Sequence, residues 1–189
     1  MLKFISKIFL KLSGWTVVGS IPPDLKKAVI IAAPHTSYWD FVYARAAFYV
    51  MGIPMKVTIK KEVVEFPVMG SMVSALGGIA IDRTPKESGL KSKISMVDAM
   101  VNLIEDNDEL IMMVTPEGTR KQVKRWKSGF YRVAEKANVP IILGYLDYAK
   151  KHAGIGSIFM PTGDYDKDVE EIKSFYRPIS GKYPAQGVV

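Results

Sequence analysis

The chain has no cysteine and only two histidines, His35 and His152, among its 189 residues. The absence of cysteine excludes disulfide bonds, thiol catalysis and thiolate metal sites, and it suits a cytosolic protein. Two histidines are too few for a histidine-rich zinc site. We therefore predict no metal site in this protein.

Long apolar runs are also missing. The longest stretch without a charged residue, 66–81, has 16 residues and contains Pro67 and three glycines. A membrane-spanning helix needs about 20 apolar residues, so no spanning segment is predicted. Internal repeats, low-complexity tracts and Ser/Gly linkers are absent as well. The sequence therefore indicates one domain, which at this length buries about 70% of its unfolded surface.

Acidic residues are in the minority, with 19 Asp and Glu against 26 Lys and Arg, for a net charge of +7. Such an excess favours acidic partners, which include nucleic acid, anionic lipid headgroups and phosphorylated small substrates. No recognisable nucleic-acid-binding module is present, and the basic residues do not alternate with stacking aromatics except around Trp126. We therefore expect no nucleic-acid partner. A non-catalytic protein that binds anionic lipid or nucleic acid remains the alternative from another functional class.

Residues 1–15 have an amphipathic pattern. Lysines at positions 3, 7 and 11 interrupt the apolar centre that a secretory signal would need, so we predict no such signal. On a helix the lysines share one arc, and bulky apolar residues fill a wide opposite arc, with Leu10 alone out of place beside the lysines. One interpretation is a helix packed on the domain. The other, which we favour, is an in-plane anchor on an anionic membrane, with Trp15 at the interface. It predicts a peripheral protein on the cytoplasmic face of a membrane.

Apolar and β-branched runs alternate with helical patterns along the rest of the chain. Strands are predicted at 28–33, 56–59, 78–81, 110–114, 140–146 and 155–160. Helices are predicted at about 38–51, 66–75, 88–106, 128–137 and 166–177. This alternation predicts an α/β layer fold, with a largely parallel mixed central sheet flanked by helices.

Polar motifs follow three of the predicted strands. His35 follows the first strand, Asp82 and Arg83 follow the run that ends at position 81, and the sequence Pro-Glu-Gly-Thr-Arg at 116–120 follows the strand at 110–114. In open α/β sheets, ligands collect at the carboxyl ends of strands. These motifs are therefore candidates for one site.

His35 and Asp40 are candidates for a catalytic pair. In a continuous helix, residues five apart point about 140° away from each other, so the two can meet only if His35 lies in the loop and Asp40 in the first helical turn. Pro34 and the capping-box form of residues 37–40 favour that arrangement. A histidine suits general-base catalysis at neutral pH, and a carboxylate on one ring nitrogen fixes its tautomer. The alternative is that Asp40 only caps its own helix and His35 is an ordinary loop residue.

The motifs lack a protein nucleophile. There is no G-x-S-x-G sequence, so the base would activate a hydroxyl, amine or water of the substrate. In the 116–120 motif, Gly118 allows close backbone approach and Arg120 suits phosphate oxygens. The alternatives are an ordinary polar turn there, and an Arg83 that pairs with Asp82 at the surface.

Taken in order, these motifs resemble the blocks of the glycerophospholipid acyltransferase family, typified by 1-acylglycerol-3-phosphate (lysophosphatidic acid) acyltransferase. Residues 35–40 resemble the H-x4-D block, 77–83 the G-x-x-x-I-D-R block and 116–120 the P-E-G-T-R block, and 139–142 are similar to a Val-Pro-rich block. The resemblance covers roughly residues 30–143. The chain departs from the pattern at three positions where the family favours an aromatic, a phenylalanine and a proline, which are Ala80, Thr115 and Leu143.

The resemblance implies transfer of a fatty acyl group from coenzyme A or acyl-carrier protein to a hydroxyl of a lysolipid or glycerol-phosphate acceptor. No cofactor beyond this acyl co-substrate is expected. It implies catalysis by His35 and Asp40, and substrate binding by Arg83, Glu117, Gly118, Thr119 and Arg120. The predicted organisation is an amphipathic helix at 1–15 and a single acyltransferase domain at 16–189. A thioester hydrolase that uses the same pair on water is the alternative within enzymes.

Overall fold

The computed structural model describes residues 1–60, 77–81 and 94–189. Seven strands within these residues form one sheet in the order β1-β7-β6-β2-β5-β3-β4. Every neighbouring pair is parallel except β6 and β7. The strands are β1 (Thr16–Val18), β2 (Lys27–Ala32), β3 (Met55–Lys60), β4 (Gly78–Ile81), β5 (Leu110–Val114), β6 (Ile141–Asp147) and β7 (His152–Phe159).

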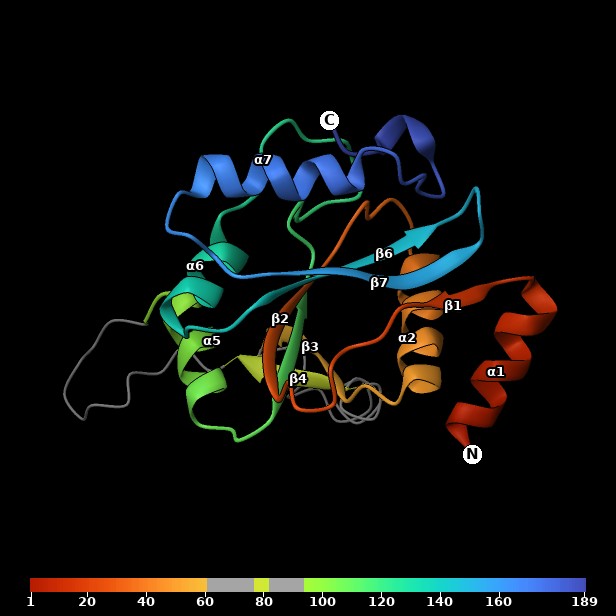
Figure 1. The fold of residues 1–189 in the computed structure, drawn as a ribbon, viewed down its shortest axis with the longest axis horizontal. Coiled ribbons are helices and arrows are strands. Elements are labelled where there is room, and N and C mark those ends of the chain that lie inside the picture. The colour runs from red at the N-terminus through yellow and green to blue at the C-terminus, as the bar shows by residue number, and fades with distance from the viewer. Residues whose placement is uncertain (61–76, 82–93) are drawn as a thin grey trace.

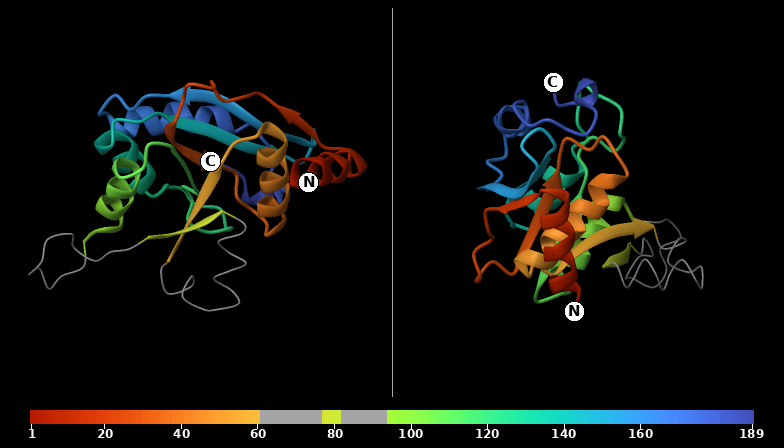
Figure 2. Two further views of the ribbon diagram at one scale, coloured as in Figure 1. Left: turned by 90° about the horizontal axis from the view of Figure 1, so that it is seen from below. Right: turned by 90° about the vertical axis from the view of Figure 1, so that its right-hand side faces the viewer.

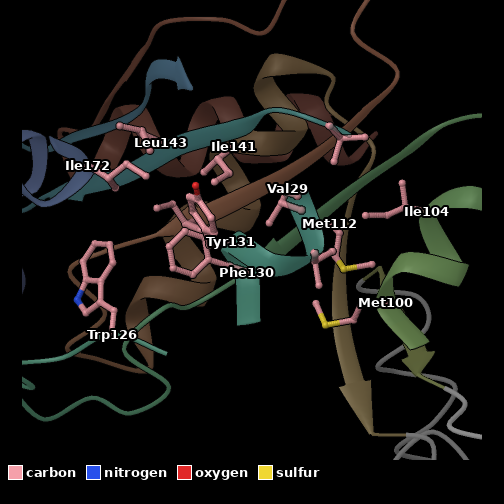
Figure 3. Close-up of a cluster of buried hydrophobic side chains, with 14 of the residues drawn as sticks. Val29, Met100, Ile104, Met112, Trp126, Phe130, Tyr131, Ile141, Leu143 and Ile172 are labelled. Atoms are coloured by element: carbon pink, nitrogen blue, oxygen red, sulfur yellow. The ribbon is translucent and has the colours of Figure 1, made fainter. Parts of the chain in front are cut away.

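Helices α5 (Met96–Glu105), α6 (Gly129–Lys136) and α7 (Tyr165–Tyr176) cover one face of the sheet. Their apolar side chains pack on alternate residues of the central strands, because successive residues of a strand point to opposite faces. Figure 3 shows this core, in which Val29 and Met112 from the sheet lie near Ile104 of α5. This core packs the central strands against α5, α6 and α7 on that face of the sheet.

The other face is covered by α2 (Trp39–Met51), against which α1 (Leu2–Ser13) lies as an outer layer (Figures 1 and 2). Ala28 and Ile30 of β2 point to this side and pack near Phe48 of α2. Helices on both faces of a largely parallel sheet make an α/β layer fold. The predicted fold class is therefore confirmed.

The predicted strands are present, with two differences. The short β1 was not predicted; it consists of three residues that pair with β7. Strand β7 begins at His152, three residues before its predicted start, because 152–154 pair with both β1 and β6. Residues 152–154 form a strand because they pair with the two adjacent strands, and their own sequence pattern does not predict one.

The predicted helices agree closely in position, except for the one predicted at 88–106. Within the described residues it begins at Met96, because the Ser95 Oγ accepts the Asp98 backbone N–H at 3.1 Å and so caps the helix there. Ile94, which lies within the predicted range, precedes the helix. The helix predicted at 66–75 lies outside the described residues. A short 3-10 turn (Pro184–Gln186) near the C-terminus was not predicted.

Helix α1 packs on the domain and also leaves apolar residues exposed. Leu10, the one apolar residue that breaks the amphipathic pattern, is only 3% exposed and joins the cluster between α1 and α2. The helix ends at Ser13 and is capped by Gly14, whose φ of 75° is in the left-handed region. The next residue, Trp15, is buried in the core at 7% exposure. The expectation that Trp15 lies at a membrane interface is therefore wrong. Large apolar residues of the helix remain exposed, namely Leu2, Phe4, Ile5, Ile8 and Leu12.

Within residues 1–60, 77–81 and 94–189, every helix falls short of the length and apolar character that a bilayer crossing requires.

Candidate active site

Loops after three parallel strands meet at one edge of the sheet. β2 pairs in parallel with both β5 and β6, so Ala32, Val114 and Asp147, where these strands end, lie at the same edge. The loop after β2 carries His35, and the loop after β5 carries residues 116–120. The topology therefore brings together motifs about 80 residues apart, as the alternation of strands and helices predicted.

His35 and Asp40 form a hydrogen-bonded pair. His35 lies in the loop and Asp40 in the first turn of α2, and the His35 Nδ1 is 3.0 Å from the Asp40 Oδ2. The imidazole keeps some solvent access, with 19% of its side chain exposed, whereas the Asp40 side chain is only 8% exposed. This is the arrangement that the spacing and Pro34 predicted.

Asp40 also holds the loop backbone. Its Oδ2 accepts the N–H groups of Thr36 and Ser37 at 2.8 Å each, while its Oδ1 accepts the hydroxyl of Tyr148 at 2.7 Å. The bond to Ser37 is the one that a capping box over 37–40 predicts, but the N-cap of α2 is Tyr38, which has no side-chain cap bond. Asp40 therefore holds the loop before the helix and contacts the imidazole at once.

The charge on Asp40 fixes the proton on the imidazole. Burial acts to raise the pKa of Asp40, but hydrogen bonds from His35, the Ser37 backbone and Tyr148 outweigh it and hold the pKa below its usual range. An ionised carboxylate can only accept hydrogen bonds, so the His35 Nδ1 carries the proton that lies between the two groups. The other ring nitrogen, Nε2, is then free to accept a proton from a substrate.

Glu117 lies behind the histidine. It is 5% exposed, and its Oε2 accepts the His35 backbone N–H at 2.7 Å. Burial raises the pKa of Glu117 to about 7, although the hydrogen bond from His35 acts in the opposite direction. The carboxyl therefore links the 116–120 loop to the backbone of the histidine loop.

Arg120 lies at the polar end of the site. Its guanidinium carbon is 3.5 Å from the centre of the Tyr38 ring, which is a cation–π contact. Its Nε is buried and makes no hydrogen bond within the described part of the chain. Gly118 is exposed with a φ of 64°, and Thr119 accepts the Lys121 backbone N–H at 3.3 Å.

A cavity of about 460 Å³ lies between α2 and the sheet, and His35, Asp40, Tyr38 and Arg120 are among its lining residues. Arg120 is the member of the 116–120 motif that lines it, whereas Glu117, Gly118 and Thr119, also predicted to bind substrate, are not among its lining residues. Arg83 lies outside the described residues. The remaining lining residues are mainly small or apolar, and they are Ile30, Ala32, Ala33, Pro34, Phe41, Ala44, Ala47, Phe48, Met51, Met113, Thr115, Gly144, Tyr145, Leu146, Ala153 and Gly154.

A sequence model of the family described as Acyltransferase matches residues 15–143, which is more than half of the 189-residue chain. The chain belongs to the acyltransferase family. The match covers α2 and the three sequence blocks, so His35, Asp40 and Arg120 lie within the part of the chain that the family model recognises.

Curated relatives carry related names. The 1-acyl-sn-glycerol-3-phosphate acyltransferases of Limnanthes douglasii and Limnanthes alba are each 33% identical over 123 residues, covering 62% of this chain and 40% of the plant protein. The probable 1-acyl-sn-glycerol-3-phosphate acyltransferase of Mycoplasma pneumoniae (strain ATCC 29342 / M129 / Subtype 1) is 29% identical over 140 residues, covering 71% of this chain and 50% of that protein. The matches thus span half or less of the length of these relatives.

A solved structure has the same fold. The crystal structure of the 1-acyl-sn-glycerophosphate (LPA) acyltransferase, PlsC, from Thermotoga maritima matches with a TM-score of 0.59 at 15% sequence identity. The match covers 92% of this chain and 74% of that chain. At this identity the likeness concerns the fold, and it agrees with the predicted α/β architecture.

One polar contact of the site was not predicted from the sequence. Tyr148, which bonds Asp40, lies five residues beyond the end of the acyltransferase family match and one residue beyond β6. A signal was present, because Tyr148 follows a predicted strand just as His35 does. The rule that ligand-site residues follow parallel strands would have found it if it had been applied to the strand at 140–146.

Proposed function

We propose that the chain transfers a fatty acyl group from a thioester to a hydroxyl of a lysophospholipid or a related glycerol-phosphate acceptor. The main support is one observation: the His35–Asp40 pair and Arg120 line the same largely apolar cavity. A base, a cation and an apolar space are what this reaction requires. The names of the curated relatives support a glycerol phosphate as the acceptor.

The proposed mechanism uses His35 as a general base. Its Nε2 takes the proton of the acceptor hydroxyl while the hydroxyl oxygen bonds to the thioester carbonyl carbon. When the carbon–sulfur bond breaks, the leaving thiolate takes that proton from the imidazolium. Asp40 stabilises the imidazolium between the two steps, and its hydrogen bond keeps Nε2 as the free nitrogen. The reaction then needs no acyl-enzyme, metal ion or cofactor other than the acyl donor, coenzyme A or acyl-carrier protein.

The apolar part of the cavity is proposed to hold the acyl chain. Ligand pockets commonly have volumes of about 300–1,000 Å³ and mostly apolar walls, and this cavity has about 460 Å³. Small residues such as Ala44, Ala47 and Gly144 leave space between α2 and the sheet. The thioester would then lie at the polar end, next to His35.

The acceptor's phosphate is proposed to lie at the polar rim. Arg120 supplies a guanidinium whose planar fork suits phosphate oxygens, and Gly118 and Thr119 precede it in an accessible loop. Arg83 remains a predicted second phosphate ligand. Glu117 is proposed to hold the backbone of His35 through a hydrogen bond and not to contact the phosphate. Holding the acceptor in this way positions its hydroxyl, and positioning can lower the barrier by several kcal/mol.

We also propose that α1 binds the cytoplasmic face of an anionic membrane in a peripheral manner. Phe4, Ile8 and Leu12 are 67%, 44% and 83% exposed, and the lysines at 3, 7 and 11 lie exposed beside them. Exposed apolar residues with flanking lysines suit insertion between anionic headgroups. A lipid acceptor would then be available where the enzyme is bound.

Co-sedimentation with vesicles that contain anionic lipid tests the role of α1. Point variants are preferable to deletion of residues 1–15, because Leu10 and Trp15 are buried in the domain. Ile8→Ser with Leu12→Ser should weaken binding. Ile158→Ser, which changes a comparably exposed residue of β7, should not. Equal binding by all three proteins would contradict the proposal.

The proposed reaction is tested by mass spectrometry of lipid products, with an acyl donor and a panel of lyso-acceptors. The wild-type chain should form the acylated acceptor, and His35→Ala should lose nearly all activity while remaining folded. His152→Ala is the matched control, since His152 lies on β7 and does not line the cavity. Free fatty acid formed without acceptor would indicate a hydrolase, and salt-dependent nucleic-acid binding without acyl transfer would indicate a binding protein. Full activity of His35→Ala would refute the mechanism.

A further inference from the structure

We propose that Tyr148 is a positioning residue for the His35–Asp40 pair, so that the catalytic unit is a chain of three side chains, Tyr148, Asp40 and His35. This inference rests on the proposed function for its kinetic consequences. Its structural basis does not depend on the substrate.

Tyr148 holds the oxygen of Asp40 that does not contact the imidazole. The Asp40 Oδ2 already has three donors, which are the His35 Nδ1 and the N–H groups of Thr36 and Ser37. Among the described residues, the partner of Oδ1 is the Tyr148 hydroxyl at 2.7 Å. Asp40 is 6% exposed, so water has little access to replace this donor. The phenol therefore fixes the rotation of the carboxylate that the imidazole depends on.

Three neighbours hold Tyr148 in place. The Tyr148 backbone N–H donates to the Ser180 carbonyl at 2.8 Å. Its ring meets Trp15 edge-on, with centroids 4.9 Å apart at 89°, and Tyr43 with centroids 6.0 Å apart at 85°. Trp15 in turn stacks on Tyr43 at 4.3 Å. The segment after α1, the helix α2 and the segment after α7 thus hold Tyr148 in place.

Tyr148 can only donate to Asp40. Burial and the nearby Asp40 carboxylate raise the pKa of Tyr148 well above its usual range, so the hydroxyl keeps its proton. A donated proton on Oδ1 stabilises the negative charge of Asp40 and leaves Oδ2 for the imidazole. Tyr148 is not among the residues that line the cavity, so it acts through Asp40 and not on the substrate.

Tyr148→Phe tests this role, because it keeps the ring and removes only the hydroxyl. Tyr43→Phe is the matched control: it removes a hydroxyl from the same aromatic cluster, and Tyr43 does not line the cavity. We expect kcat to fall about ten- to hundred-fold in Tyr148→Phe, which is the worth of one hydrogen bond to a charged group. KM should change less than about two-fold, because the substrate contacts are unchanged. Tyr43→Phe should retain both values.

A second measurement works without any substrate. The chain has only two histidines, so ¹⁵N NMR of the imidazoles gives two sets of signals, and His152→Ala assigns them. In the wild-type chain, neutral His35 should carry its proton on Nδ1, and Tyr148→Phe should lower the fraction of that tautomer. Tyr43→Phe should not.

Two results would overturn the proposal: a kcat of Tyr148→Phe equal to that of Tyr43→Phe, or a neutral wild-type His35 protonated on Nε2. The second result is independent of whether Tyr148→Phe folds. If no acyl transfer is found in any variant, the proposed function fails, and the tautomer measurement still decides whether Tyr148 orients the pair.

Discussion

The Nδ1 of His35 lies 3.0 Å from the Oδ2 of Asp40, and the same oxygen accepts two backbone N–H groups of the intervening loop. The loop between the two residues is thus folded around the carboxylate that orients the imidazole. A single carboxylate thus holds both the loop before α2 and the imidazole of the base.

Asp40→Asn tests the charge of this carboxylate more than its geometry. The amide oxygen can still accept the backbone N–H groups of Thr36 and Ser37, so the loop should remain folded. The neutral amide cannot stabilise an imidazolium, and kcat should fall about 10²- to 10⁴-fold. Steady-state kinetics checks this, with Asp98→Asn, an exposed carboxylate of α5, as control. Wild-type kcat in Asp40→Asn would exclude the general-base pair.

Arg120→Ala should weaken binding of a phosphorylated acceptor. Loss of one charge-assisted contact corresponds to an increase of about ten- to hundred-fold in the acceptor's KM. Kinetics at saturating acyl donor measures this. Lys121→Ala removes an exposed positive charge from the next position and should have little effect. An unchanged KM in Arg120→Ala would contradict the proposal that Arg120 binds the acceptor's phosphate.

Glu117→Gln should change how stability depends on pH. Burial raises the pKa of Glu117 from 4.5 to about 7, so the folded protein binds this proton more tightly than the unfolded chain does. Raising the pH from 5 to 8 therefore costs the wild-type protein about 2–3 kcal/mol of unfolding free energy at this group, and Gln removes that loss. Urea unfolding at both pH values measures the difference, and the exposed Glu109→Gln is the control. Equal pH dependence in wild type and Glu117→Gln would contradict the raised pKa.

Ala47→Leu should shift the preference toward shorter acyl donors. Ala47 lines the cavity, so a larger side chain there occupies space proposed for the acyl chain. Ala46→Leu is the matched control, because both alanines belong to the same buried cluster and Ala46 is not among the residues that line the cavity. It should cost about 1–3 kcal/mol by overpacking and leave chain-length preference unchanged. A competition assay with acyl donors of several lengths distinguishes the two, and identical preference in both variants would argue against the proposed chain site.

The pairing of His35 with Asp40 was predictable from the sequence because it is local. Helix geometry, Pro34 and the capping box act within six residues and leave one arrangement in which the two side chains meet. Tyr148 reaches Asp40 across 108 residues. That contact depends on β6 lying beside β2, and apolar runs identify strands without giving their order.

The same limit applies to the edge of the sheet and to α1. Strand β1 has three residues, too few for a periodic pattern, and it exists by pairing with β7. Leu10 breaks the helical pattern, and the structure gives the reason: together with Phe9 it packs α1 against the domain. Most residues of the apolar arc of α1 are exposed, whereas Leu10, which lies outside that arc, is buried against the domain.

Helix α2 contributes to the site in two ways. Its first turn carries Asp40, and its later turns form a wall of the cavity. A shift of this helix to admit a longer chain would carry the acid with it and disturb the base. Redesign of chain length should therefore keep the helix in place and exchange individual wall side chains. Directed evolution for a new donor is expected to accumulate substitutions at positions such as Ala44 and Ala47, with the register of α2 retained.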